Sequence, residues 1–84
     1  MKPSKRQIKK ALLDAFRLHG RRRIPLPALV SFAMRKLGTT LTEHLDHFQL
    51  IHGFIRTNWG NDGLFSRRRG VEKGGIKVRD RVRL

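Results

Sequence analysis

The sequence predicts an α+β domain in which three helices precede a C-terminal β-hairpin. Apolar residues recur at helical spacing in three separate segments of the first two thirds of the chain. From Ile76 onward, apolar residues instead alternate with basic ones, which is the period of a strand with one buried face and one exposed face. A chain of 84 residues is short enough for one core, so we expect residues 1–84 to form a single domain.

The first expected helix covers about residues 5–18. Ser4 and Gln7 have the spacing of a capping box at its start, and Gly20 suits the left-handed conformation that often follows a helix end. Its expected apolar face comprises Ile8, Ala11, Leu12, Ala15 and Phe16. Its opposite face is basic and comprises Lys5, Arg6, Lys9, Lys10 and Arg17.

A short strand near residues 22–24 and a second helix over residues 27–37 are expected next. Pro27 suits the first turn of a helix, where its missing N–H costs nothing. Gly38 marks the end of this helix. The residues expected to be buried are Leu29, Val30, Ala33 and Leu37.

The third helix is expected over about residues 41–55, with Thr40 and Glu43 as a second capping box. Its expected apolar stripe comprises Leu41, Leu45, Phe48, Ile51, His52 and Ile55, with Leu50 and Phe54 beside it. Its expected exposed residues are Thr42, Glu43, His44, Asp46, His47 and Gln49. Trp59 follows in a turn-rich stretch, and we expect it to cover the core beneath the hairpin.

Residues 64–84 predict the hairpin. Gly70 and the pair Gly74 and Gly75 permit the positive φ values of a tight return. One face of the second arm is expected to carry Ile76, Val78 and Val82, and the other Lys77, Arg79, Arg81 and Arg83.

The charge distribution points to a polyanionic partner. The chain has 20 Lys and Arg against 6 Asp and Glu, a net charge of +14. The balance is +8 over residues 1–23, zero over residues 24–63 and +6 over residues 64–84. Self-repulsion of this size costs stability, and clustered arginines suit phosphate oxygens. Nucleic acid is therefore favoured over an anionic membrane surface, which would require a helix with an uncommitted apolar face.

Several other classes of protein are not expected. Without cysteine there is neither a disulfide framework nor a thiolate zinc site, and this fits a reducing cytoplasm, or association with the nucleoid in a prokaryote. No apolar run approaches the length of a membrane span or of a signal peptide. His44 and His47 match no strong zinc signature, and Ser31 and Ser66 lack the surroundings of a nucleophile. We therefore expect no enzyme, no cofactor and no metal.

The order of helix, short strand, helix, helix and hairpin resembles that of the winged helix-turn-helix family along the whole chain. The resemblance implies that the first strand pairs with the second arm of the hairpin, so that residues 21–23 lie beside Lys77, Arg79 and Arg81. In that family the helix after the turn usually enters the major groove. Glu43 and Asp46 disfavour base reading by the third helix here, because phosphates repel carboxylates.

A second resemblance is to the LOTUS (OST-HTH) winged-helix subgroup, which is associated with RNA and with helicase partners. It is carried by Gly53-Phe54-Ile55-Arg56, then Leu64-Phe65-Ser66, and a Gly-Gly hairpin.

The expected function is binding of double-stranded DNA, as a transcriptional regulator or an accessory factor. Two alternatives stay open: an RNA-binding or ribosome-associated module, and an adaptor or inhibitor that docks acidic protein partners. The oligomeric state is not indicated. The expected nucleic-acid contacts are Lys5, Lys9, Arg21, Arg22, Arg23, Arg67, Arg68, Arg69, Lys73, Lys77, Arg79 and Arg81.

Overall fold

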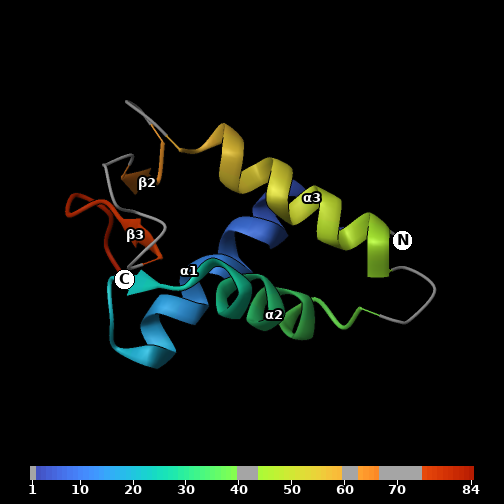
Figure 1. The fold of residues 1–84 in the computed structure, drawn as a ribbon, viewed down its shortest axis with the longest axis horizontal. Coiled ribbons are helices and arrows are strands. Elements are labelled where there is room, and N and C mark those ends of the chain that lie inside the picture. Colours follow the sequence, from blue (N-terminus) through green and yellow to red (C-terminus); the bar gives the residue numbers. More distant parts are fainter. Residues whose placement is uncertain (1, 40–43, 60–62, 67–74) are drawn as a thin grey trace.

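Three helices and a three-stranded antiparallel sheet make up the part of the protein that the structure describes, which is the α+β composition that the sequence predicts. The structure is a computed structural model and describes residues 2–39, 44–59, 63–66 and 75–84. The elements are α1 (Lys5–His19), β1 (Arg23–Ile24), α2 (Leu26–Lys36), α3 (His44–Thr57), β2 (Phe65–Ser66) and β3 (Ile76–Val78) (Figure 1). The expected capping box of Thr40 and Glu43, and the hairpin tip with Gly70 and Gly74, lie outside the described residues.

The ends of α1 are set by local side-chain chemistry, as the sequence predicts. The Gln7 backbone N–H donates to Ser4 Oγ at 3.2 Å, and the Ser4 N–H donates to Gln7 Oε1 at 2.7 Å. This capping box satisfies backbone donors that the first helical turn leaves unpaired. Gly20, with φ 63°, ends the helix in the left-handed region. The observed helix extends one residue beyond the expected one.

α2 begins and ends within one residue of the expected bounds. Pro27 lies in its first turn, and the helix ends at Lys36 with Leu37 as the C-cap. Leu29, Val30 and Ala33 are buried as expected, together with Met34. Leu37, expected in the core, is only half-buried, because it lies at the cap rather than on the inner face of the helix.

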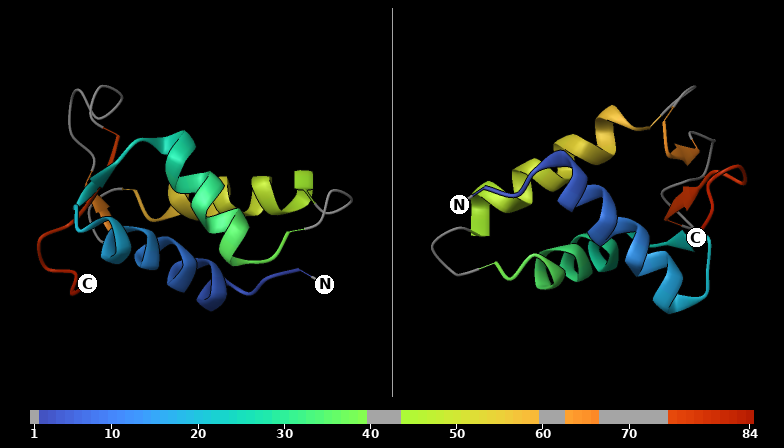
Figure 2. Two further views of the ribbon diagram at one scale, coloured as in Figure 1. Left: turned by 90° about the horizontal axis from the view of Figure 1, so that it is seen from below. Right: turned by 180° about the vertical axis from the view of Figure 1, so that it is seen from behind.

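The sheet has the strand order β1-β3-β2, so the last strand in the sequence is the central one. Arg23 pairs with Lys77 and Ile24 with Ile76, which confirms the pairing of the first strand with the second arm of the hairpin. Phe65 of β2 pairs with Val78 on the other side of β3. The sheet closes one end of the helical group, and the three helices extend away from it (Figure 2).

The core lies between the helices and the inner face of the sheet. Phe16 of α1 and Phe65 of β2 are both fully buried, and their ring centroids are 6.2 Å apart. Trp59 packs against this core as expected, and its indole Nε1–H donates to the Ser66 carbonyl at 3.0 Å. The donor of the indole ring is thereby satisfied while its apolar area covers the edge of the sheet.

The expected buried face of α3 is partly wrong. Leu45 is 71% exposed and Phe48 40% exposed, whereas His47, expected at the surface, is 4% exposed. Ile51 and Ile55 are buried as expected, and they follow His47 at four-residue intervals, whereas His52 is only half-buried. His47 is accommodated because its Nδ1 is hydrogen-bonded with Thr39 Oγ1 at 2.8 Å, which satisfies a polar group that burial would otherwise leave unpaired.

The second arm of the expected hairpin is shorter than the alternation predicts. β3 ends at Val78, and the chain turns so that the Val82 N–H donates to the Arg79 carbonyl at 3.0 Å. Val82 still packs against the core. Arg81 and Arg83 are exposed, but they lie in the turn and the C-terminal segment, not on a strand face.

Two substitutions on α3 test its observed orientation. We expect Ile51→Ala to lower the free energy of unfolding by about 2–5 kcal/mol, because it leaves a cavity in the core. Leu45→Ala, the control on the exposed face, should change it by less than about 0.5 kcal/mol. Urea unfolding followed by circular dichroism measures both, and equal losses of stability would contradict the observed orientation of the helix.

Two glycines with opposite surroundings give a second test. Gly75 has φ +91°, and a Cβ there would lie 2.2 Å from the Ile24 carbonyl oxygen, so Gly75→Ala should cost about 2–4 kcal/mol. Gly53 lies inside α3 with nothing within 4 Å of an added Cβ, so Gly53→Ala should stabilise the protein by about 0.5–1 kcal/mol. The midpoints of thermal unfolding should move in opposite directions; a shift of the same sign for both variants would count against the close approach of Gly75 to β1.

Candidate nucleic-acid interface

The outer face of the sheet carries a row of polar and basic side chains. Arg23 pairs with Lys77, and Lys77 pairs with Ser66 on the next strand. Directly opposed residues of antiparallel strands share a face, with Cβ atoms about 4.5–5.5 Å apart. Their sequence neighbours Ile24, Ile76, Val78 and Phe65 are buried in the core. The sheet therefore places an ammonium, a guanidinium and a hydroxyl side by side on the face opposite the core.

Arg22 connects the two basic ends of the chain. Its Nη2 donates to the Val82 carbonyl at 2.9 Å and also to the Arg79 carbonyl. Its own carbonyl accepts from the Val78 N–H at 2.8 Å. The guanidinium of Arg22 thus holds the turn after β3 against β1, which makes it a structural contact as well as an expected nucleic-acid contact.

The turn after β3 surrounds an open hollow of about 210 Å³. The Lys77 ammonium lies 3.7 Å from a carboxylate oxygen of Asp80, whose side chain is 83% exposed. The Arg81 guanidinium donates to the Gly63 carbonyl at 3.2 Å and is exposed. The lining residues are Ser66, Lys77, Arg79, Asp80 and Arg81. Asp80 had no assigned role in the sequence, because only the turn shows that its carboxylate lies among cations.

The other expected contacts are separated from this surface or lie outside the described residues. Lys5 and Lys9 are exposed on α1, whose first turn is farthest from the sheet and whose last turn is nearest (Figures 1 and 2). Arg21 is exposed beside the sheet. Nothing is described for Arg67, Arg68, Arg69 and Lys73. The expected contacts that the structure describes therefore form a main group at the sheet and a second group on α1.

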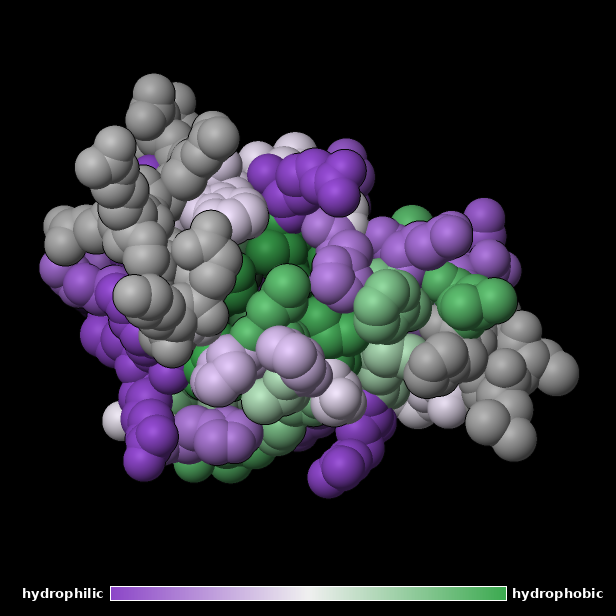
Figure 3. Space-filling view, in the orientation of Figure 1, coloured by the Kyte–Doolittle hydropathy of each residue, from purple (hydrophilic) through white to green (hydrophobic). Residues whose placement is uncertain are grey.

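The rest of the surface seen in Figure 3 carries both hydrophilic and apolar side chains. Hydrophilic side chains gather over the sheet end of the molecule, while apolar atoms show along the seam between α2 and α3 and over the first turns of α3 (Figure 3). Leu45 and Phe48 are exposed on that helix, and the Phe48 and His52 rings are 4.3 Å apart. α3 therefore exposes apolar and aromatic side chains near its start, whereas the basic Arg56 is exposed in its last turn. The four-residue spacing of His47, Ile51 and Ile55 is the sequence signal for the observed buried face of α3.

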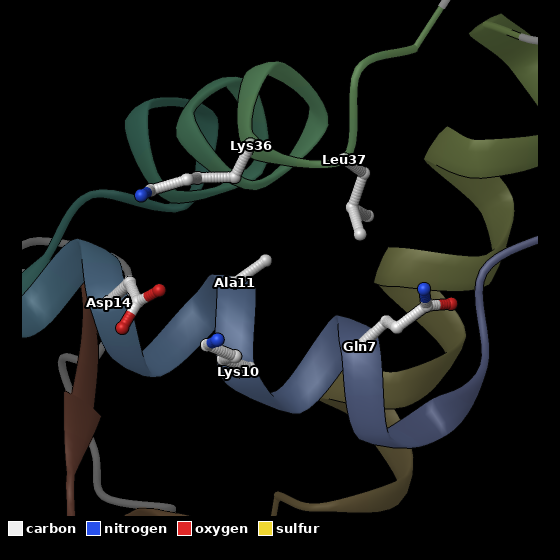
Figure 4. A pocket seen from close by; sticks show the side chains of 6 residues that line it. All are labelled: Gln7, Lys10, Ala11, Asp14, Lys36 and Leu37. Carbon is white, nitrogen blue, oxygen red and sulfur yellow. The ribbon is translucent and has the colours of Figure 1, made fainter.

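A second hollow of about 340 Å³ lies between α1 and the end of α2. Figure 4 shows Lys36 and Leu37 on the α2 side, with Ala11 pointing from α1 into the gap. Its lining residues are Gln7, Lys10, Ala11, Asp14, Lys36 and Leu37. These side chains mix charges of both signs with aliphatic atoms and include no hydroxyl, thiol or imidazole.

Two further observations concern metal ligands and membrane-spanning helices in the described part of the chain. Among those residues, no three His, Cys, Asp or Glu side chains are grouped so that they could hold a metal ion. His47, one of the two histidines weighed as metal ligands, is buried and bonded with Thr39. No helix there has both the length and the apolar character needed to cross a membrane.

Comparison of the chain with protein-family models, with curated proteins and with solved structures finds no match in any of the three.

The role of Arg22 in holding the turn can be tested with a conservative substitution. Arg22→Lys keeps the charge but loses the planar fork that reaches two carbonyls, so we expect the free energy of unfolding to fall by about 1–2 kcal/mol. Arg21→Lys, at the exposed neighbouring position, should change it by less than about 0.5 kcal/mol. Chemical denaturation of both variants gives the comparison, and an Arg22→Lys variant as stable as Arg21→Lys would show that the two hydrogen bonds contribute little.

Proposed function

We propose that this chain is a winged helix-turn-helix domain that binds nucleic acid, with duplex DNA as the favoured partner, through the basic end formed by the sheet and the turn after β3. The observation that carries the proposal is the register of β1 and β3. It brings Arg23 beside Lys77, and so joins the two charge-rich ends of an 84-residue chain on one face.

The arrangement of elements supports the fold part of the proposal. The order of α1, β1, α2, α3, β2 and β3, with β1 paired to β3, is the one expected of a winged helix. In that arrangement, β2 and β3 with the intervening residues form the wing. The chain differs from a groove-reading member of the family in the exposed Leu45 and Phe48 on α3. The wing and β1, rather than α3, are therefore assigned the main contacts.

Electrostatics support nucleic acid as the partner. Arginine and lysine side chains that contact phosphates release condensed counterions, which gives affinity without sequence preference. The net charge of +14 also attracts a polyanion over long distances at low salt. Contacts of this kind position a protein on the nucleic-acid backbone, whereas base edges are needed for specificity. We therefore propose a non-covalent binder with little sequence preference of its own, acting as an accessory or regulatory factor in the cytoplasm.

A double substitution in the segment 21–23 tests this function. We expect Arg21→Gln with Arg23→Gln to weaken binding to a random-sequence duplex about tenfold or more at about 0.15 M salt. The slope of log K against log salt should become shallower by about 0.9 for each phosphate that the variant no longer neutralises. The matched control, Arg35→Gln with Lys36→Gln, removes the same charge from the exposed last turn of α2 and should have a clearly smaller effect.

Fluorescence anisotropy with labelled duplex provides the measurement, and structured RNA and an acidic protein serve as competitors. Equal weakening by the two double variants would contradict a contact surface at the sheet. Displacement of the duplex by much lower concentrations of RNA would assign the surface to RNA, whose A-form helices are recognised through shape and backbone. Displacement by the acidic protein alone would favour an adaptor.

A further inference from the structure

A carboxylate lies in the middle of the basic turn. Asp80 Oδ1 is 3.7 Å from Lys77 Nζ and 3.8 Å from Arg22 Nε. In the described part of the chain, these two cations are the groups that its carboxylate contacts. Residues 64–84 hold eight basic side chains and only two acids, and one of these two acids lines the hollow.

The two ion pairs are loose. Both distances exceed those of a charge-assisted hydrogen bond, which are about 2.7–2.9 Å. The Asp80 side chain is 83% exposed, so water and salt screen its attraction to the cations. An anion that binds Lys77 more strongly can therefore replace the carboxylate there.

The hollow has the donors that a phosphate group requires. Lys77 supplies an ammonium from the centre of the sheet, and Ser66, its cross-strand neighbour, supplies a hydroxyl. Arg81 lies on the same rim with an exposed guanidinium. Lysine, arginine and serine side chains are among the common donors to phosphate oxygens in nucleic-acid complexes.

We propose that this hollow is a binding site for one phosphate group, here called the seat, and that Asp80 occupies it as an intramolecular competitor. The inference deepens the proposed function and rests on it for the identification of the ligand as a nucleic-acid phosphate. When a phosphate enters, the Asp80 carboxylate moves aside, and Lys77 and Arg81 bind the phosphate oxygens. Because the carboxylate must be displaced, Asp80 lowers the affinity of the basic surface for every phosphate-bearing ligand.

Replacing the carboxylate by its neutral isostere tests the proposal. Asp80→Asn should tighten binding to a random-sequence duplex by about two- to tenfold at about 0.15 M salt, as expected when an exposed competing pair is removed. The slope of log K against log salt should stay the same, because the same phosphates are engaged once the carboxylate has moved aside. Asp14→Asn is the matched control: its carboxylate is also ion-paired, with Arg17 at 2.8 Å, and its removal raises the net charge equally. It should change affinity less than twofold and leave the slope unchanged.

A titration with inorganic phosphate separates the seat from the nucleic-acid proposal. Nuclear magnetic resonance should show phosphate-dependent shifts at the Lys77 and Ser66 amides, at lower phosphate concentration in Asp80→Asn than in the wild type. Adding Lys77→Gln to Asp80→Asn should abolish the gain in affinity, and thermal unfolding checks that each variant is folded.

Equal tightening by Asp80→Asn and Asp14→Asn would overturn the proposal, since net charge alone would then explain the effect. Weaker binding by Asp80→Asn would also overturn it, because Asp80 would then position the cations rather than compete for them. If phosphate shifts the Lys77 and Ser66 amides as expected but no duplex binds, the seat stands and the nucleic-acid proposal fails. If duplex binds and the amides do not respond in either variant, the nucleic-acid proposal stands and the seat fails.

Discussion

The contact between Phe16 of α1 and Phe65 of β2 joins the helices to a sheet that is too small to persist alone. Its strands are two or three residues long, and short hairpins are at best marginally stable in water. The two rings, with centroids 6.2 Å apart, are fully buried and supply the apolar cover that the inner face of the sheet requires. The basic outer face can be displayed only because the inner face is covered in this way.

The charges at the sheet are held together by groups that offset their repulsion. Like charges on neighbouring strands destabilise a sheet when they lie opposite each other. Arg23 and Lys77 do lie opposite each other in the register. Arg22 turns its guanidinium toward two carbonyl oxygens, and the Asp80 carboxylate lies near both Arg22 and Lys77. One arginine of the 21–23 segment therefore contributes to folding, which leaves its neighbours to face a partner.

Local chemistry made the ends of α1 predictable to within one residue, and a resemblance in the order of elements made the strand pairing predictable. Ser4, Gln7 and Gly20 act within one helical turn of the residues they cap, so the sequence contains their whole effect. The pairing of β1 with β3 depends on residues more than fifty positions apart, and only the resemblance to a known arrangement of elements indicated it.

The orientation of α3 and the length of β3 could not be predicted because both depend on distant polar partners. Leu45 and Phe48 are as apolar as the residues that are buried, so periodicity alone extended the expected buried stripe to them. The hydrogen bond with Thr39 makes burial of His47 possible. Likewise, the guanidinium of Arg22 binds the carbonyls of Arg79 and Val82. In a longer β3 these carbonyls would be available for pairing with a neighbouring strand. The basic composition of the candidate site could be predicted from the sequence, whereas the place of Asp80 in it could not.

The position of β3 has a consequence for how the chain acquires its structure. Of the three strands described, it leaves the ribosome last, yet it lies between β1 and β2, and neither of these has its sheet partner until residues 76–78 are available. The helices rely on nearer neighbours and can associate earlier, whereas closing the sheet is a non-local and therefore slow step. A nascent chain stopped short of Ile76 would keep Phe65 without Val78, and the apolar surface normally hidden beneath the sheet would be open to chaperones and to aggregation.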